Sequence, residues 1–435
     1  MNNQPVKQKI LIISYYWPPS GGSGVQRWLK FAKYLPKNNW EPVIITVDPD
    51  KASYFLLDNS LLNDVDESIK IYRTNSFEPI RLFSKILGKK NMPHSGFSNV
   101  NSNSRIQTLF RYIRGNLFKV DPRKGWNKYA YKTAVEIIDK YQIKYVVTTS
   151  PPHSSQLIGL NLKLNRDIIW IADLRDPWTD IFYYDQLSKI KYLKDKEEEL
   201  EKRVINEADL VLTVSDGLKE TFSMKSAHSE NIYVVENGFD TADIITSQIV
   251  PNFKLKGKYN LLYVGVISSL YNIKTFFKAF KNVTQLIPGL HLSFVGVQDQ
   301  SIHDLVEELG LSNYISFYGY VKKSDLVNYY ANSDVLFLAI PDTKGNKGIV
   351  TGKIFEYMSY KKPIVAIGPL DGDAAEILNK VDAGKIFNYD DQYGLELFIS
   401  NLVNREIKFS FAGLEYFSRE NLTKKLVGII EKIQN

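Results

Sequence analysis

Short apolar runs that alternate with helix-length segments are the feature of this 435-residue sequence that most limits its possible folds. Runs rich in valine, isoleucine and leucine indicate strands buried on both faces, as in parallel sheets covered by crossover helices. One series comprises residues 9–14, 42–47, 145–150, 168–173, 210–215 and 232–237, and a second comprises 260–266, 292–297, 315–320, 334–340 and 363–368. Each series is long enough to form a separate doubly wound α/β domain.

The segment between the two series marks the expected domain boundary. Residues 244–260 have no clear periodicity and contain Pro251 and a Lys-Gly-Lys turn. We therefore expect a first domain at 1–245 and a second at 246–417, with a helix at 418–435 that can complete the first domain. Residues 76–125 lack the rhythm of strands and are expected to be an insertion in the first domain, and the acid-rich helix expected at 194–208 is interpreted as solvated.

The composition narrows the class of protein. Hydrophobic residues make up 44% of the chain and charged residues 24%, which is typical of a folded protein. The absence of cysteine excludes disulfides and thiolate metal sites and fits a reducing compartment. No stretch approaches the roughly 20 apolar residues of a membrane helix, and the first apolar run is too short for a secretory leader. These features favour a cytoplasmic location.

Positive charge is concentrated in one segment. Residues 79–132 contain 12 lysines and arginines and a single acid, Asp121, so the segment carries +11 and the rest of the chain −4. Aromatic side chains are interleaved with these cations, and such a mixture suits an anionic membrane surface. A solvated surface insertion is the alternative. No recognisable nucleic-acid-binding module accompanies the charge, so we do not expect a nucleic-acid partner.

A glycine-rich loop follows the first expected strand. Two prolines end the strand, and a loop with Gly22 and Gly24 leads into a helix that begins near Val25. Glycines allow backbone N–H groups to approach a phosphate, and a helix amino terminus adds partial positive charge. The third glycine of a dinucleotide fingerprint is missing. The loop is therefore either a phosphate contact or an ordinary tight turn between strand and helix.

A histidine follows another strand end, in the sequence TTSPPHSSQLIG at 148–159. His153 is placed at the carboxyl end of the strand, where ligands bind in open α/β sheets. A role in a site and a role as an ordinary surface residue are both compatible with this position.

Charged residues cluster directly after the strand expected at 168–173. Asp173, Arg175, Asp176 and Asp180 lie within eight residues. A buried strand that ends in so many charges is costly unless they pair or meet a ligand. We expect a site in which Arg175 orients one or both acids, and an Arg–Asp bracket that holds the loop is the alternative.

A cation and a carboxylate stand three residues apart where a helix is expected to begin, after the glycine-containing loop at 341–352. Residues with this spacing share a helix face. Gly352 lets the helix amino terminus approach an anion, Lys353 adds a full charge, and Glu356 can accept hydrogen bonds from two hydroxyls. The set suits a nucleoside diphosphate with its ribose, and an ordinary Lys–Glu surface pair is the alternative.

Three Asp-x-Asp triplets, at 48–50, 64–66 and 371–373, are the only hint of a metal site. Such pairs can hold a divalent ion against a diphosphate. None has a supporting cluster of ligands in the sequence, and we expect neither a metal nor a cofactor.

Taken together, these segments resemble the retaining nucleotide-sugar glycosyltransferases of family four, whose GT-B fold consists of two facing Rossmann-like domains with a cleft between them. The resemblance spans nearly the whole chain and depends on the order and spacing of six segments: SYYWPPSGGSGVQR, VSDGLKE, VVENGFD, LLYVGV, FYGYVKKSDLVNYYANSDVLFL and GKIFEYMSYKKPIVAI. TSPPHSSQLIG with IADLRDPWTD is similar to a branch of the family found in bacterial surface-polysaccharide assembly.

The resemblance implies that the second domain binds the nucleotide sugar. Glu356 matches the second acid of the family's Glu-x7-Glu motif, which holds the ribose, whereas Gly348 stands at the position of the first acid. Lys353 matches the lysine of this branch, and Thr351 stands where the branch has proline or threonine. The motif is therefore half present.

At the family's other donor-binding positions, this sequence matches some residues and differs at others. Gly265 matches the glycine of the diphosphate clamp, but a valine follows it and the nearest cation, Lys274, comes later than in the family. Tyr320 and Val321 match positions whose backbone reads the nucleobase. The loop at 21–24 matches the glycine-rich loop that closes on the donor phosphates and the acceptor.

The resemblance thus implies a hexosyltransferase, with a retaining mechanism, that uses a UDP- or GDP-sugar and a lipid-linked glycan acceptor at the inner face of the cytoplasmic membrane. The leaving diphosphate can itself take the acceptor proton, with Asp173 or His153 as candidates for handling the acceptor. Two alternatives remain: a sugar-nucleotide epimerase of similar shape, and a catalytically degenerate scaffold that binds nucleotide sugar.

Overall fold

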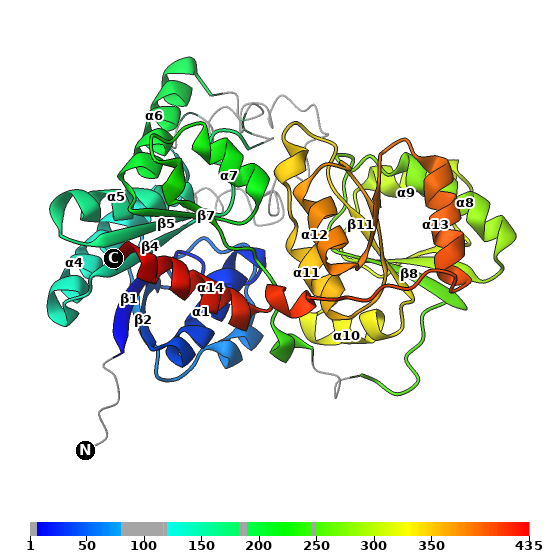
Figure 1. Cartoon of the computed structure of the whole chain (residues 1–435), viewed down its shortest axis with the longest axis horizontal. Helices are drawn as coiled ribbons and strands as arrows, with labels where there is room; N and C mark the ends of the chain where they lie inside the picture. Colours follow the sequence, from blue (N-terminus) through cyan, green and yellow to red (C-terminus); the bar gives the residue numbers. More distant parts are fainter. Residues whose placement is uncertain are drawn as a thin grey trace. The chain divides into compact units, whose positions relative to one another are not determined.

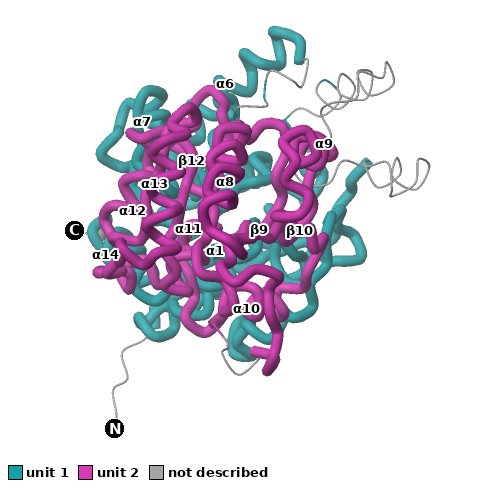
Figure 2. Tube along the Cα trace, turned by 90° about the vertical axis from the view of Figure 1, so that its right-hand side faces the viewer, with its two compact units in different colours: residues 1–236, 419–435 teal, residues 237–418 magenta. Residues whose placement is uncertain are grey.

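The structure is a computed structural model that describes residues 7–79, 116, 120–181, 184, 189–244 and 249–434. The chain divides into two compact units, one formed by 1–236 together with 419–435 and the other by 237–418 (Figures 1 and 2). The sequence had placed this boundary after residue 245. None of the described helices is both long and apolar enough to cross a membrane.

The first unit is built on a parallel sheet of seven strands in the order β3-β2-β1-β4-β5-β6-β7. The strands are β1 (Gln8–Ile13), β2 (Trp40–Val47), β3 (Lys70–Thr74), β4 (Tyr145–Ser150), β5 (Ile169–Leu174), β6 (Leu210–Thr213) and β7 (Ile232–Val234). All side chains of β4 and nearly all of β2 are buried, which explains their continuous apolar sequences.

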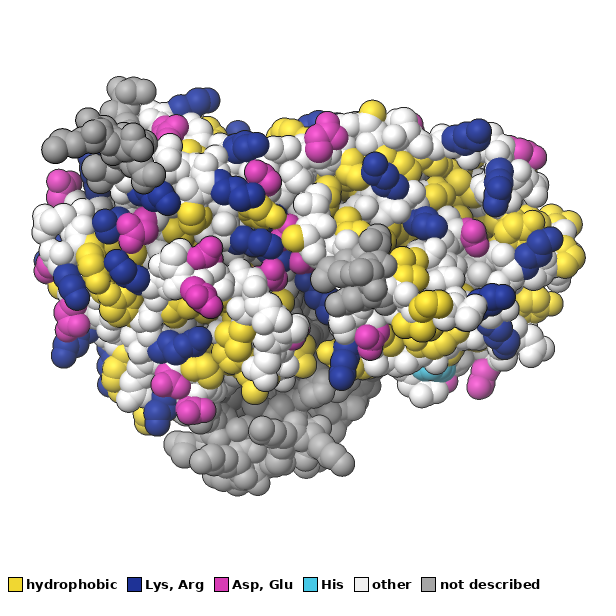
Figure 3. All heavy atoms as spheres, turned by 90° about the horizontal axis from the view of Figure 1, so that it is seen from below, with side chains coloured by type: hydrophobic (Ala, Val, Ile, Leu, Met, Phe, Trp, Pro, Cys, Tyr) yellow, Lys and Arg dark blue, Asp and Glu magenta, His cyan; other side chains and the backbone are white. Residues whose placement is uncertain are grey.

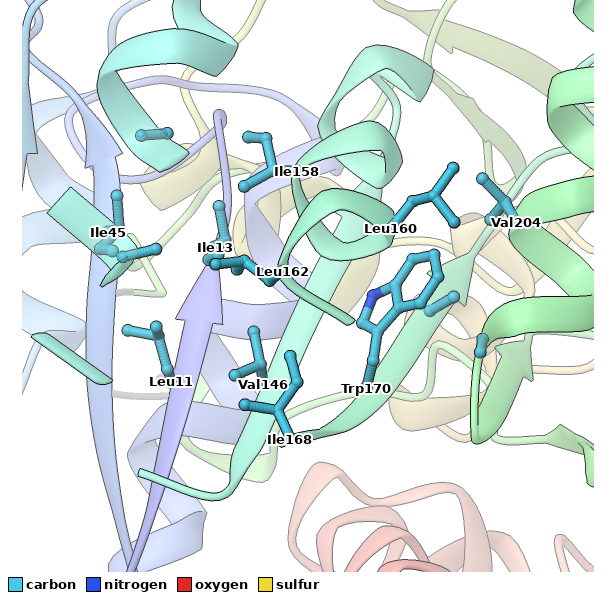
Figure 4. Close-up of a cluster of buried hydrophobic side chains, with 14 of the residues drawn as sticks. Leu11, Ile13, Ile45, Val146, Ile158, Leu160, Leu162, Ile168, Trp170 and Val204 are labelled. Carbon is cyan, nitrogen blue, oxygen red and sulfur yellow. The ribbon is translucent and has the colours of Figure 1, made fainter. Parts of the chain in front are cut away.

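Helices cover both faces of this sheet (Figure 1). They are α1 (Ser23–Tyr34), α4 (Asn127–Tyr141), α5 (Gln156–Asn165), α6 (Lys191–Glu207), α7 (Asp216–Ser223) and α14 (Arg419–Glu431). On one face, Trp170 of β5 lies between Leu160 of α5 and Val204 of α6 (Figure 4). On the other, α1 packs with α14, whose Leu422 and Leu426 are fully buried. The last helix of the chain is thus part of the first unit.

The second unit repeats the same plan with six parallel strands in the order β10-β9-β8-β11-β12-β13. The strands are β8 (Tyr259–Val264), β9 (Leu290–Val295), β10 (Ile315–Phe317), β11 (Val335–Ala339), β12 (Ile364–Ile367) and β13 (Gly384–Phe387). The helices are α8 (Lys274–Leu286), α9 (Gln300–Glu308), α10 (Lys323–Ala331), α11 (Gly352–Ser359), α12 (Asp373–Val381) and α13 (Gln392–Val403).

Each face of the second sheet has its own core. Helices α8, α9 and α13 contribute to one core, and α10, α11 and α12 to the other. The α8 sequence shows why this helix forms and packs, because Phe276, Phe280 and Val283 recur at helical spacing and are fully buried. Two Rossmann-like domains with parallel sheets are thus confirmed.

The expected insertion at 76–125 lies largely outside the described residues, as does most of the basic segment at 79–132. The described ends of the insertion come together, because a Cβ added at Gly125 would lie 1.7 Å from the carbonyl oxygen of Phe77. On the face seen in Figure 3, lysines and arginines are spread over the surface with acidic side chains among them.

Candidate functional site

Both sheets have a point at which the strand order reverses. In the first sheet it lies between β1 and β4, and in the second between β8 and β11. Ligands of open α/β sheets bind outside the carboxyl ends of the strands at such switch points. Gly22 and Gly24 follow β1, His153 follows β4, and Gly265 follows β8, while the 341–351 loop follows β11. These predicted site residues therefore lie at the switch point of one unit or the other.

A row of glycines lines the carboxyl edge of the second sheet beside its switch point. The Gly265 N–H donates to Val295 O at 2.7 Å, and the Gly296 N–H donates to Gly319 O at 2.6 Å. Gly265 and Gly296 both have φ of 123°, and a Cβ at Gly296 would come within 2.4 Å of Gly265 O. Backbone conformation and lack of space both exclude side chains at Gly265 and Gly296, so this part of the edge consists of backbone alone.

Lys353 reaches from α11 to this row. A Cβ at Gly265 would lie 2.4 Å from Lys353 Cε, so the side chain covers the glycine directly. Its Nζ donates to the Tyr263 hydroxyl at 2.9 Å. Burial lowers the pKa of Lys353. The structure thus brings together Gly265 and Lys353, which are far apart in the sequence.

Glu356 follows one turn later and is partly exposed. Burial raises the pKa of Glu356, and the charge of Lys323 acts against that rise. Within the described part of the chain no ion pair or hydrogen bond joins Glu356 to Lys353. The assignment of the two side chains to a ligand site stays a prediction, and the missing close ion pair favours it over an ordinary Lys–Glu surface pair, although the two charges still attract each other at longer range.

The amino terminus of α11 has no side-chain cap. Thr351 occupies the cap position without bonding to the helix, and among the described residues its hydroxyl has no hydrogen-bond partner although it is buried. Gly352 is exposed, and a Cβ added there would meet nothing within 4 Å. The Ile354 N–H donates to Thr351 O at 3.2 Å, whereas the N–H groups of Gly352 and Lys353 have no hydrogen-bond partner among the described residues, as an anion site requires. Gly348, at the position of the family's first acid, is buried.

The remaining predicted donor residues are placed differently. Lys274 forms an ion pair with Glu308 of α9 at 2.8 Å, and in the described ranges no hydrogen bond or ion pair joins it to Gly265 or Lys353. Tyr320 is 69% exposed and follows Gly319, the last glycine of the row. Val321 is half-buried and packs against the core.

In the first unit, Asp173 is fully buried and engaged on both oxygens. Arg27 Nε donates to Oδ1 at 3.0 Å, while Trp28 Nε1 and Thr149 Oγ1 each donate to Oδ2 at 2.7 Å. Arg27 is 1% exposed and also donates to Val235 O at 2.7 Å. Asp173 therefore joins β5 to α1 and β4. Its proposed part in handling the acceptor stays a prediction, and its contacts favour a structural role.

Among the described residues, the hydrogen bonds of Arg175 go to backbone carbonyl groups of two loops. Its N–H groups donate to the carbonyl oxygens of Ser150 at 2.9 Å, Gly24 at 2.9 Å and Pro151 at 3.3 Å. Arg27 holds the Asp173 carboxylate, and within the described ranges no hydrogen bond or ion pair joins Arg175 to Asp173 or Asp176, so the expectation that Arg175 orients one or both acids stays a prediction. Arg175 fixes the glycine-rich loop after β1 against the loop after β4.

Two of the predicted site residues in this region, Asp176 and His153, have polar side-chain atoms without a hydrogen bond to the described residues. Asp176 is partly exposed and forms no hydrogen bond with any residue that the structure describes, and burial raises the pKa of its carboxyl group. The His153 ring stacks on Trp178 at 5.5 Å with an interplanar angle of 9°. Burial lowers the pKa of His153 to about 4, so the imidazole is neutral at pH 7. Its Nδ1 has no partner within the described ranges.

Sequence reasoning missed the residues that hold this region in place. Helix α6 was expected to be solvated, yet Glu197 and Glu201 are fully buried. Glu201 accepts the Trp178 N–H at 2.9 Å, and Glu197 accepts the Lys189 ammonium at 2.6 Å. The two glutamates lie four residues apart on the buried side of the helix with Val204, which is the signal that could have identified them.

Residues 245–406 match the family model described as glycosyl transferases group 1. Solved structures similar to the chain include a glycosyltransferase from Rickettsia africae, with 16% identity over 99% of both chains and a TM-score of 0.62. HepE from Anabaena, in complex with UDP and glucose, has 13% identity over 98% of this chain and 100% of its own, with a TM-score of 0.62.

A third similar structure is the apo form of the lipopolysaccharide outer core galactosyltransferase WaaB, with 15% identity over 98% of this chain and 99% of its own and a TM-score of 0.57. No curated protein matches the sequence. The chain therefore has the fold of the GT-B glycosyltransferases, and the match to the glycosyl transferases group 1 model lies within its second unit.

Proposed function

We propose that this chain is a glycosyltransferase that moves a hexose from a UDP- or GDP-sugar to a glycan acceptor. The observation that carries the proposal is the ammonium group of Lys353, which lies against the bare backbone of Gly265 at a switch point. Among the described residues no carboxylate lies within ion-pair distance of it, and α11 begins beside it with an uncapped amino terminus. An anionic ligand such as a diphosphate would satisfy both.

The donor is proposed to lie along the glycine row. Its diphosphate would contact Lys353, the Thr351 hydroxyl and the N–H groups that begin at Gly352, and its ribose hydroxyls would donate to Glu356. Tyr320 and Val321 would flank the nucleobase next to Gly319. The similar HepE structure, which contains UDP and glucose, supports a uridine nucleotide as the first donor to test.

The chemistry is proposed to depend on positioning and electrostatics, with retention of anomeric configuration. As the sugar leaves, negative charge develops on the diphosphate, where Lys353 and the α11 amino terminus stabilise it. The oxygen of that diphosphate can take the proton of the acceptor hydroxyl. Of the residues in the first unit, Asp176 would orient that hydroxyl and the buried His153 is the second candidate, whereas both oxygens of Asp173 are already engaged.

The acceptor is proposed to be a lipid-linked glycan of a bacterial surface polysaccharide, reached at the inner face of the cytoplasmic membrane. The basis is the +11 charge of residues 79–132 with its interleaved aromatic side chains. We expect the chain to bind vesicles that contain anionic lipid, and we expect this binding to weaken as salt rises from 0.05 to about 0.5 M because screening shortens the reach of the charges. Co-sedimentation measures it, and equal binding to neutral vesicles would contradict the electrostatic part.

Turnover of intact sugar nucleotides tests the proposed reaction and separates it from the two alternatives. The full chain is incubated with UDP-glucose, UDP-galactose, UDP-N-acetylglucosamine or GDP-mannose. Each reaction is run with and without a detergent extract of bacterial lipid-linked saccharides, and mass spectrometry identifies the products by mass. We expect one donor to release its nucleoside diphosphate and to leave its sugar on a saccharide. An epimerase would change the sugar without any acceptor, and a degenerate scaffold would leave every donor intact.

A further inference from the structure

The hydroxyl group of Tyr263 contacts the ammonium group of Lys353. Tyr263 lies in β8, is fully buried and packs against Phe294 at 5.4 Å and Phe337 at 5.9 Å between ring centroids. Phenylalanine would satisfy that packing. The hydroxyl oxygen instead accepts the Lys353 ammonium at 2.9 Å and donates to Val266 O at 2.9 Å, so its position and direction are both fixed.

A second tyrosine closes the other side of the ammonium. Lys353 Nζ lies 4.8 Å from the ring centroid of Tyr263 and 6.0 Å from that of Tyr271. The loop of Tyr271 is fastened to the 341–351 loop, because the Asp342 N–H donates to Leu270 O at 3.0 Å. A cation over aromatic faces is attracted by the ring quadrupoles without being neutralised.

The helix that carries Lys353 is fastened to the same strand. Tyr357 lies one turn after Lys353 on α11 and is fully buried. Its hydroxyl accepts the backbone N–H of Val264 at 2.8 Å. Both ends of the lysine side chain, the helix at its base and the ammonium at its tip, are thus held against the carboxyl end of β8.

This arrangement uses one of the three donors of the ammonium, and no carboxylate in the described part of the chain forms an ion pair with it, although Glu356 attracts it at longer range. Burial disfavours such a cation, and its pKa is lowered accordingly. Two N–H groups remain for a ligand beside Gly265. A lysine is flexible, so affinity for an anion depends on how much of that freedom has been removed before binding.

We propose that Tyr263 is a positioning residue that presents the ammonium of Lys353 to the diphosphate of the donor, with Tyr271 as the second wall. The inference rests on the proposed function for the identity of the ligand. It assigns to Tyr263 no contact with the donor, so the tyrosine acts on binding only through Lys353.

A double-mutant cycle tests this inference, with inorganic pyrophosphate and UDP as probes titrated into the full chain by calorimetry. Tyr263→Phe is expected to weaken both ligands about fivefold to tenfold, and Lys353→Met about tenfold or more. The double variant should match Lys353→Met alone, because without the ammonium the hydroxyl has nothing to place. Unchanged affinity in Tyr263→Phe, or losses that add in the double variant, would overturn the inference.

Tyr357→Phe is the matched control, because it removes a nearby buried hydroxyl that bonds only to backbone atoms. Because Tyr357 anchors α11 as a whole, and with it the uncapped amino terminus, part of the effect of Tyr357→Phe on affinity should remain in the Lys353→Met background, where Tyr263→Phe should have none. If the wild-type chain binds pyrophosphate with the expected coupling but binds neither UDP nor GDP, the positioning role stands and the proposed function fails. If it binds UDP without coupling, the function stands and the inference fails. Binding of no probe contradicts both.

Discussion

Replacing Asp173 with alanine is expected to lower the free energy of unfolding of the first unit by about 3–5 kcal/mol, because the change leaves Arg27 as a buried cation without its carboxylate. Trp28 and Thr149 lose their acceptor at the same time. For a unit of this size each kcal/mol shifts the melting temperature by about 2–4 °C, so calorimetry should record a fall of about 6–20 °C.

Asp176→Asn is the matched control, since it removes a carboxylate three residues away that has no hydrogen bond to the described residues. Burial holds the pKa of Asp176 above its unfolded value, so ionisation of this group costs stability as the pH rises above the unfolded pKa. At pH 7 the amide variant should therefore melt at the same temperature as the wild type or slightly higher, while losing transferase activity. If Asp176→Asn destabilises as strongly as Asp173→Ala, the division of roles between the two acids is contradicted.

The central strands were predictable because burial on both faces leaves an unmistakable apolar sequence. Two outer strands of the sheets were not. β3, with the sequence KIYRT, lies at an edge and keeps most of its side chains partly exposed, so its pattern resembles a loop. β13 has only four residues and begins with a glycine. Strands at the margin of a sheet are fixed by pairing with a neighbour, which a local pattern does not encode.

The candidate site likewise contains residues that a local sequence pattern identifies and residues that only contacts between distant segments identify. Lys353 and Glu356 were identified because their meaning is local, a spacing of three residues at a helix start. The partnership of Arg27 with Asp173 joins residues 146 positions apart. In the sequence, Tyr263 is an ordinary strand residue, and only the fold places its hydroxyl beside Lys353. The sequence suggests that Glu197 and Glu201 are solvated, because carboxylates are seldom fully buried. Their burial is possible because hydrogen-bond donors from other segments of the chain satisfy their oxygens.

Lys353→Met is expected to weaken UDP binding by about 10–100-fold, because a hydrogen bond to a charged group is worth about 1.5–3 kcal/mol. Methionine keeps the apolar stem that packs over Gly265. The pKa of Lys353 is lowered in the folded state, so the unfolded chain binds the proton more strongly and the charge costs stability at pH 7. The variant should therefore be at least as stable as the wild type, which separates lost binding from lost folding.

Glu356→Gln is expected to give a different pattern from Lys353→Met. The carboxylate is assigned to the ribose, so the amide should weaken UDP by up to about tenfold and leave inorganic pyrophosphate unaffected. Lys353→Met should weaken both ligands, because both contain the diphosphate. Equal effects of Glu356→Gln on the two ligands would contradict the assignment of Glu356 to the ribose.

Calorimetric titration of UDP and GDP into the full chain tests the central claim most directly, namely that the carboxyl edge of the second sheet binds the nucleotide of a sugar donor. We expect at least one of the two nucleotides to bind the wild-type chain and Lys353→Met to weaken that binding at least tenfold. Absence of binding by both nucleotides, or an affinity that Lys353→Met and Glu356→Gln leave unchanged, would contradict this claim.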